Sequence, residues 1–346
     1  MADTRPLRNI AIIAHVDHGK TTLVDHLLRQ AGTFRANQEV AECVMDSNDL
    51  ERERGITILA KNCSLTYRGT KINIIDTPGH ADFGGEVERV LKMADGVVLL
   101  VDAAEGVLPQ TKFVLRKAFL HQLRPIVVIN KIDRPDARAH EVLDQVFDLF
   151  VELGATNEQL DFPHLYAAGR LGYAKAELEH ESKDLQPLFE TILKHVPEPR
   201  RDLAAPLKVQ VSNIDYNDYV GRIAIGRIFQ GTIRPGETYT AIGQDGRRRQ
   251  EKVVTLEVFE GLQRQPVDEA GAGEIIALSG FEEVHIGDTL CAGADAEPLP
   301  PVPIDEPTLK MLFVSNNSPF SGKEGKYVTS RQVRDRLDRE MLRNVA

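Results

Sequence analysis

Short apolar runs rich in β-branched residues alternate with stretches of helical periodicity along residues 1–200. This alternation predicts a parallel sheet flanked by helices, because strands that are buried on both faces are nearly all apolar. The expected strands are Asn9–Ala14, Asn62–Tyr67, Lys71–Asp76, Gly96–Asp102, Pro125–Asn130 and His164–Ala167. The expected helices are Lys20–Ala31, Glu86–Met93, Thr111–Gln122, Arg138–Glu152 and Leu185–His195. The pattern therefore predicts an α/β domain over residues 1–200, with a polar, mobile loop over Thr33–Gly55.

The pattern changes after the proline-rich stretch Val196–Pro206. From Leu207 to Cys291, short strands are separated by frequent glycines, which predicts a small β-barrel over residues 205–302. Beyond it, a strand is expected over Thr308–Val314 and a basic amphipathic helix over Ser330–Asn344. One strand and one helix cannot bury a core by themselves. We therefore interpret residues 305–346 as the start of a third domain that is cut short.

Composition narrows the class of protein. Hydrophobic residues make up 42% and charged residues 27%, as in ordinary globular proteins, and the three cysteines show no C-x-x-C spacing. The chain has neither an apolar run of about 18 residues nor a signal peptide, so we expect a cytoplasmic protein with no membrane attachment. The net charge of −10 argues against DNA binding by bulk charge. However, Lys310–Arg343 holds eight basic and four acidic residues and could contact RNA.

The strongest chemical signal is a phosphate-binding loop, Ala14–Thr22, which lies between a predicted strand and a predicted helix. Backbone amides of such a loop point at phosphate oxygens, and the helix N-terminus favours negative charge. Lys20 would reach the β- and γ-phosphates, and the Thr21 hydroxyl would bind magnesium. Ala14 stands where the general pattern has its first glycine. A chance Gly-Lys-Thr sequence is disfavoured because both flanking elements are in place.

Two further segments supply candidates for magnesium binding and catalysis. Asp76 ends an apolar strand and could hold magnesium through water, while Gly79 could place an amide on a γ-phosphate. His80 could orient an attacking water as a neutral imidazole. In the segment Arg54–Thr57, the Thr57 hydroxyl could bind magnesium and sense the γ-phosphate. Taken alone, each segment could instead be an ordinary strand or turn.

A guanine-recognition element follows the strand that ends at Asn130. The carboxylate of Asp133 can accept hydrogen bonds from guanine N1–H and from the exocyclic amine, a pair of donors that adenine lacks. The amide of Asn130 would serve the base edge and brace the phosphate loop. The aliphatic stem of Lys131 could lie across the ring. Together these residues predict specificity for guanine.

These elements, in this order, resemble those of translational GTPases of the elongation-factor class. The strings Val44–Glu51, Gly79–Arg89 and Ser318–Lys326 closely resemble the BipA/TypA subfamily. The resemblance implies an α/β P-loop GTPase domain, a translation-factor β-barrel and the start of a ferredoxin-like α+β domain. It also implies a monomeric GTPase whose slow hydrolysis of GTP to GDP is stimulated by the ribosome. The partner would be large-subunit rRNA at the factor-binding site.

The resemblance assigns roles to individual residues. The nucleotide would be bound by Asp17, His18, Gly19, Lys20, Thr21, Thr22, Gly79, Asn130, Lys131, Asp133, Ala168 and Gly169. Catalysis would depend on His80, Lys20 and Thr57, and Mg²⁺ on Thr21, Thr57 and, through water, Asp76. Asp17 matches an aspartate linked to a monovalent cation. In relatives a Ser-Ala pair reads the base carbonyl, and here Ala168-Gly169 replaces it, which keeps the backbone amide and loses the hydroxyl.

Three alternative functions remain open from the sequence. The chain could be another elongation or back-translocation factor, although the strings that resemble BipA/TypA argue against this. It could be a P-loop ATPase or kinase, which the guanine element at Asn130–Asp133 opposes. It could also be an RNA-binding or ribosome-assembly module that GTP switches without catalysis, since a switch and an enzyme share every element above.

Overall fold

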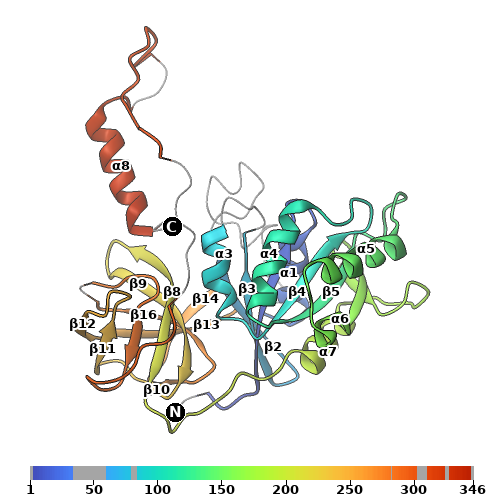
Figure 1. Ribbon diagram of the computed structural model, residues 1–346, viewed down its shortest axis with the longest axis horizontal. Coiled ribbons are helices and arrows are strands. Elements are labelled where there is room, and N and C mark those ends of the chain that lie inside the picture. Colours follow the sequence, from blue (N-terminus) through green and yellow to red (C-terminus); the bar gives the residue numbers. More distant parts are fainter. Residues whose placement is uncertain are drawn as a thin grey trace.

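The computed structural model describes residues 3–33, 60–78, 84–281, 283–301, 310–323 and 327–343 (Figure 1). A seven-stranded sheet forms the first domain, in the order β2-β3-β1-β4-β5-β6-β7. Its strands are β1 (Leu7–Ala14), β2 (Lys61–Tyr67), β3 (Thr70–Asp76), β4 (Gly96–Asp102), β5 (Arg124–Asn130), β6 (His164–Ala168) and β7 (Tyr173–Lys175). The five inner strands are parallel, as predicted, whereas β2 and β7 run antiparallel at the two edges.

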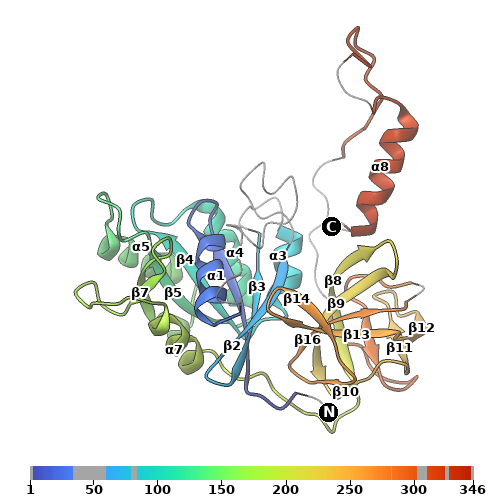
Figure 2. The same cartoon turned by 180° about the vertical axis from the view of Figure 1, so that it is seen from behind.

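Helices cover both faces of this sheet. They are α1 (Lys20–Gln30), α3 (Gly84–Leu91), α4 (Pro109–Leu120), α5 (Ala139–Glu152), α6 (Asn157–Leu160) and α7 (Gln186–His195). The apolar sides of α1 and α7 pack on one face (Figure 2), and those of α3, α4 and α5 pack on the other. Each strand of the parallel core is therefore buried on both faces, which explains its nearly continuous apolar sequence.

The second domain is an antiparallel β structure with one apolar core. Its eight-stranded sheet has the order β12-β11-β17-β8-β9-β16-β13-β14, and β10 pairs with β15 beside it. The strands are β8 (Lys208–Asn217), β9 (Gly221–Gln230), β10 (Thr232–Ile233), β11 (Thr238–Ile242), β12 (Arg248–Lys252), β13 (Thr255–Glu260), β14 (Gln263–Pro266), β15 (Ala270–Gly271), β16 (Ile275–Ser279) and β17 (Thr289–Cys291). Core residues come from strands near both ends of the sheet order, including Tyr239 of β11 and Leu256 of β13, so the sheet curls around a common interior.

The C-terminal segment corrects one prediction. The strand expected over Thr308–Val314 is not formed in its described part, residues 310–314, which pairs with no other described residue. A strand requires a partner for its backbone hydrogen bonds, and none of the described strands supplies one. The predicted helix is present as α8 (Ser330–Arg343). The apolar side chains from Met311 to Val314 are exposed.

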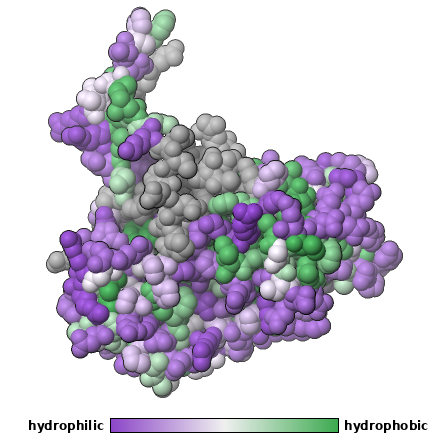
Figure 3. All heavy atoms as spheres, viewed as in Figure 1, coloured by the Kyte–Doolittle hydropathy of each residue, from purple (hydrophilic) through white to green (hydrophobic). Residues whose placement is uncertain are grey.

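Among the described residues, no helix combines the length and the apolar character needed to cross a bilayer. In the view of Figure 3, hydrophilic side chains cover most of the coloured surface. Isolated exposed apolar residues occur over α4 and α5, such as Leu120 and Val151. Scattered apolar residues of this kind are normal on protein surfaces.

A buried polar seam joins the two domains. Asn9 of β1 donates hydrogen bonds from Nδ2 to the carbonyl oxygen of Gly273 and to Asp95 Oδ2, each at 2.9 Å. Asn73 of β3 donates from Nδ2 to Asn9 Oδ1 at 2.9 Å and to Glu274 Oε1 at 3.0 Å. Lys71 Nζ lies 3.1 Å from the same Glu274 oxygen. These contacts lie towards the amino ends of β1 and β3, away from the carboxyl edge of the sheet.

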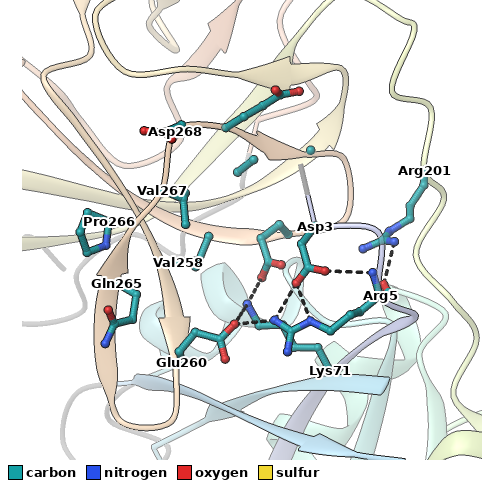
Figure 4. Close-up of a pocket in the computed structure, with 14 residues that line it drawn as sticks. Asp3, Arg5, Lys71, Arg201, Val258, Glu260, Gln265, Pro266, Val267 and Asp268 are labelled. Atoms are coloured by element: carbon teal, nitrogen blue, oxygen red, sulfur yellow. Dashed lines mark hydrogen bonds and ion pairs between the residues drawn. The ribbon is translucent and has the colours of Figure 1, made fainter. Parts of the chain in front are cut away.

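A cavity of about 380 Å³ opens beside this seam (Figure 4). Arg5 and Lys71 line it from the first domain, and Glu260 and Glu274 line it from the second. The basic groups are paired within the wall, since Arg5 Nη2 lies 2.6 Å from Glu260 Oε1 and Lys71 binds Glu274. The lining therefore acts as part of the contact between the domains.

Breaking the seam at Glu274 is expected to destabilise the protein strongly. Among the described residues, Glu274→Ala leaves the buried ammonium of Lys71 with only the 3.6 Å contact to Glu260. Removing one partner of a buried ion pair costs about 3–5 kcal/mol. Urea unfolding should measure this loss. Lys112→Ala breaks an exposed pair with Glu152 and is the control, with an expected loss below about 1 kcal/mol. Equal losses in the two variants would contradict the importance of the seam.

Candidate functional site

The predicted site residues gather at the carboxyl edge of the parallel sheet. Strands β1, β3, β4, β5 and β6 end there at Ala14, Asp76, Asp102, Asn130 and Ala168. In open α/β sheets, ligands bind outside the carboxyl ends of the strands. Within the described ranges, no three His, Cys, Asp or Glu side chains cluster in a way that could hold a metal ion by themselves.

The phosphate-binding loop connects β1 to α1 through two residues with left-handed backbone conformations. Asp17 has φ of 64° and an exposed side chain, and Gly19 has φ of 93°. A Cβ atom at Gly19 would lie 2.6 Å from Asn130 Nδ2, so this position requires glycine for conformation and for space. Thr21 and Thr22 are half-buried in the first turn of α1. The loop thus directs the amino end of α1 to the carboxyl edge, an arrangement suited to anions.

Lys20 and Asp76 form a buried ion pair at this edge. Lys20 Nζ lies 2.8 Å from Asp76 Oδ1, and it also donates a hydrogen bond to the carbonyl oxygen of Thr77. The contact with Asp76 has the distance of an ion pair without the direction of a hydrogen bond. Neither carboxylate oxygen accepts a hydrogen bond from a described residue, although Asp76 is fully buried. A buried carboxylate without hydrogen-bond donors has the oxygen chemistry that Mg²⁺ and its bound water prefer.

Asn130 ties the phosphate loop to the end of β6. Its Nδ2 donates to the carbonyl oxygen of His18 at 2.8 Å, and its Oδ1 accepts from the backbone amide of Gly169 at 2.8 Å. Ala168 and Gly169 are both buried. A Cβ atom at Gly169 would lie 3.1 Å from Asn130 Oδ1, so a larger residue would press on this bond. Asn130 therefore holds two of the predicted nucleotide-binding loops in a fixed relation.

Lys131 and Asp133 follow Asn130 and have different environments. Lys131 has φ of 62°, and its Nζ lies 2.7 Å from Asp102 Oδ2. A lysine in the left-handed region is uncommon, and such strain often marks a functional site. Asp133 is exposed and makes no hydrogen bond or ion pair with any residue that the structure describes. Its carboxylate is therefore available to a ligand.

His18 is buried inside the phosphate loop. Its Nδ1 accepts a hydrogen bond from the backbone amide of Asp102 at 3.3 Å, and Nε2 lies 3.6 Å from a Glu105 carboxylate oxygen. Burial lowers the pKa of His18 below 6.5, and the proximity of His15 acts in the same direction. The contact with the Leu100 backbone, and then the charges of Asp102 and Glu105, oppose this shift without reversing it. The imidazole is therefore neutral near neutral pH.

Acidification is expected to destabilise the protein through His18. The folded protein binds fewer protons than the unfolded chain between the lowered pKa of His18 and 6.5, so the free energy of unfolding falls as the pH drops through this range. Between about pH 7.5 and about pH 5.5, the melting temperature of His18→Asn should fall less than that of the parent. Replacement of the exposed His180 by asparagine is the control and should keep the parental pH response. Equal responses in all three proteins would contradict the prediction.

Three predicted site residues, Thr57, Gly79 and His80, lie outside the described residues. So does most of the loop expected over Thr33–Gly55. Asp102 was not among the predicted site residues, although the structure places it between the phosphate loop and the guanine element. The sequence could have indicated Asp102, because this residue ends an apolar strand just as Asp76 and Asn130 do.

Comparison with known proteins matches both domains to families. The family described as elongation factor Tu GTP binding domain matches residues 5–198, and elongation factor Tu domain 2 matches residues 221–291. A solved bacterial selenocysteine-specific elongation factor, EF-Sec, has a TM-score of 0.62 at 24% identity, covers 84% of this chain and is itself covered to 45%. At 24% identity, this similarity supports a shared fold and nothing about function. The α/β domain and the translation-factor β domain predicted from the sequence are confirmed.

Curated relatives share more than half of their aligned residues with this chain. "Large ribosomal subunit assembly factor BipA" of Bacillus subtilis is 57% identical over 98% of the chain. The protein of the same name from Synechocystis is 59% identical over 99%, and that of Escherichia coli O157:H7 is 56% identical over 98%. The chain spans 56–57% of the length of these relatives. The predicted resemblance to the BipA/TypA subfamily is thereby confirmed.

Proposed function

Because the chain belongs to the family of proteins with an elongation factor Tu GTP-binding domain, we propose that it binds GTP at the carboxyl edge of its sheet and hydrolyses it to GDP and phosphate. We further propose that it does so as a factor acting on the large ribosomal subunit, the role that the name of its BipA relatives states for them. The partner at that subunit would be rRNA at the factor-binding site. The observation that carries the nucleotide proposal is the connected set of Lys20, Asp76, Asn130, His18 and Gly169 at one edge.

The phosphates are proposed to bind at the amino end of α1. Lys20 is held near the phosphate position by Asp76 and can transfer its contact to the β- and γ-phosphates, where it would neutralise charge that develops during the reaction. Bound Mg²⁺ would supply further charge neutralisation. Thr21 and Thr57 would hold it directly, and Asp76 would hold it through water. A monovalent cation beside Asp17 stays a prediction from the family resemblance.

The guanine base is proposed to lie between Lys131 and the end of β6. Asp133 would accept from guanine N1–H and the exocyclic amine, and its exposed, unpaired carboxylate supports this role. Asn130 would fix the relation between the base and the phosphates through its bonds to His18 and Gly169. The amide of Ala168 or Gly169 would face the base carbonyl. This arrangement disfavours adenine, and with it the ATPase or kinase alternative.

Hydrolysis is proposed to proceed by in-line attack of a water on the γ-phosphate, with His80 orienting that water. His80→Ala should then lower ribosome-stimulated turnover by about 100-fold, because one positioned group contributes on the order of that factor. Its affinity for GTP, measured by calorimetry, should stay within about twofold of the parent. Loss of GTP binding by this variant would contradict the assignment.

The proposal as a whole is tested by calorimetry with GDP, a non-hydrolysable GTP analogue and ATP, each with Mg²⁺, followed by turnover with and without ribosomes. Selective guanine binding with ribosome-stimulated turnover is the expected result. Selective binding without turnover would favour the alternative of a GTP-switched assembly module. Equal binding of ATP would overturn the guanine-specific site.

A further inference from the structure

Asp102 connects two loops that belong to separate nucleotide-binding elements. It ends β4 and is fully buried, and it lies in neither the phosphate loop nor the guanine element. Its backbone amide donates to His18 Nδ1 at 3.3 Å, and its Oδ2 lies 2.7 Å from Lys131 Nζ. One residue therefore contacts the phosphate loop through its backbone and the guanine element through its side chain.

The carboxylate of Asp102 is held in one orientation. Its Oδ1 accepts hydrogen bonds from the backbone amides of Ala104 at 2.7 Å and Glu105 at 3.2 Å. Its Oδ2 lies 2.7 Å from Lys131 Nζ and accepts a longer hydrogen bond, of 3.4 Å, from Arg134, whose guanidinium also pairs with Asp136. Burial by itself would raise the pKa of Asp102, but the hydrogen bonds from Lys131 and from these two amides lower it. Asp102 is therefore a fixed negative charge beside a flexible lysine side chain.

This charge restricts Lys131. A free lysine side chain samples many rotamers, and anchoring its ammonium group removes much of that freedom before a ligand arrives. The backbone of Lys131 is already fixed in a left-handed conformation, and the amide of the next residue, Ile132, donates to the carbonyl oxygen of Ala167 at 3.2 Å. With both ends held, the aliphatic stem of Lys131 has a defined path at the carboxyl edge of the sheet.

We propose that Asp102 is a positioning residue that sets how long guanine nucleotides stay bound, by holding the stem of Lys131 against the face of the base. The proposal rests on the guanine site proposed above. Asp102 itself touches no nucleotide and acts through Lys131. The hydrogen bond from its backbone amide to His18 keeps the carboxylate of Asp102 at a fixed position relative to the phosphate-binding loop.

Dissociation of fluorescent GDP, followed by stopped flow, tests the proposal. Asp102→Asn keeps the size of the side chain and an oxygen for the Ala104 amide, but it removes the charge that binds Lys131 at 2.7 Å and, more weakly, Arg134 at 3.4 Å. We expect GDP to dissociate about tenfold faster, as for the loss of one charge-assisted contact. Lys112→Ala, which breaks the exposed pair with Glu152, is the control and should stay within about twofold of the parent.

A second ligand separates positioning from general loosening of the loop. Inosine diphosphate has the same ring face as GDP but lacks the amine that Asp133 would read. If Asp102 acts through the stem of Lys131, Asp102→Asn should speed the dissociation of both ligands by the same factor. If the substitution merely displaces the loop, Asp133 moves too. The dissociation of GDP should then be accelerated far more than that of inosine diphosphate. That outcome would overturn the proposal.

Lys131→Met provides a second test of the proposal, and this test does not depend on the folding of the Asp102 variant. It removes the anchored ammonium and should speed dissociation by about the same factor as Asp102→Asn. GDP should dissociate from the double variant no faster than from the faster of the two single variants, because both substitutions remove the ion pair between Asp102 and Lys131. Rates within about twofold of the parent for Lys131→Met, or additive losses in the double variant, would overturn the proposal. A parent chain that does not prefer GDP to ATP would instead contradict the proposed function.

Discussion

Replacing Asp133 by asparagine is expected to change the nucleotide preference of the chain from guanine to xanthine. The carboxylate can accept two hydrogen bonds from guanine, one from N1–H and one from the amine at C2. An asparagine amide offers one acceptor and one donor, so its NH₂ group would face the guanine amine, donor against donor. Xanthine carries a carbonyl oxygen at C2 and matches this amide. Because Asp133 is exposed and binds no other described residue, the substitution should leave the fold unchanged.

The expected loss of GDP affinity is about 1,000-fold, or about 4 kcal/mol, since a charge-assisted pair is lost and a donor is left unpaired. Calorimetry with GDP and xanthosine diphosphate measures both preferences. Asp136→Asn is a matched control in the same loop, because its carboxylate is also exposed and pairs with Arg134. It should keep GDP affinity within about twofold of the parent. An unchanged preference in Asp133→Asn would mean that this carboxylate does not read the base.

The positions of the site residues were predictable because of where the apolar strands stop. The sequence placed the ends of three strands at Asp76, Asp102 and Asn130, and the structure ends them at the same residues. A strand that is buried on both faces is mostly apolar as it approaches the carboxyl edge of the sheet, so the polar residue that ends the apolar run marks that edge. Candidate ligand-binding residues in a parallel sheet therefore have a strong sequence signal.

Other features have no such signal. Periodicity says nothing about strand direction, so the strand predicted over Asn62–Tyr67 was expected in a parallel sheet, whereas β2 runs antiparallel at its edge. The short strand β7 and the four-residue helix α6 were not predicted. The strand expected over Thr308–Val314 has the composition of a strand, but pairing depends on a partner elsewhere in the chain. The sequence pattern also does not indicate which distant positions contact each other. This is why the sequence identified Lys131 and overlooked its buried partner Asp102.

The same limit applies to Lys20 and Asp76, which the sequence assigned to phosphate and magnesium but not to each other. Lys20→Ala is expected to have two separable effects. It should lower the affinity for GDP and GTP by about 1,000-fold, because a buried ammonium no longer meets the phosphates. It should also lower the free energy of unfolding of the nucleotide-free protein by about 3 kcal/mol, because Asp76 is left as a buried charge without a partner.

The double variant Lys20→Ala/Asp76→Asn distinguishes these effects. Removing the orphaned charge should restore most of the lost stability in urea unfolding, because the cost lies in burying an unpaired carboxylate. Nucleotide affinity should stay as low as in Lys20→Ala, since the phosphates still lack their cation. A double variant no more stable than Lys20→Ala would show that the ion pair does not stabilise the free protein. Recovery of nucleotide binding would show that Lys20 acts by neutralising Asp76 and makes no phosphate contact of its own.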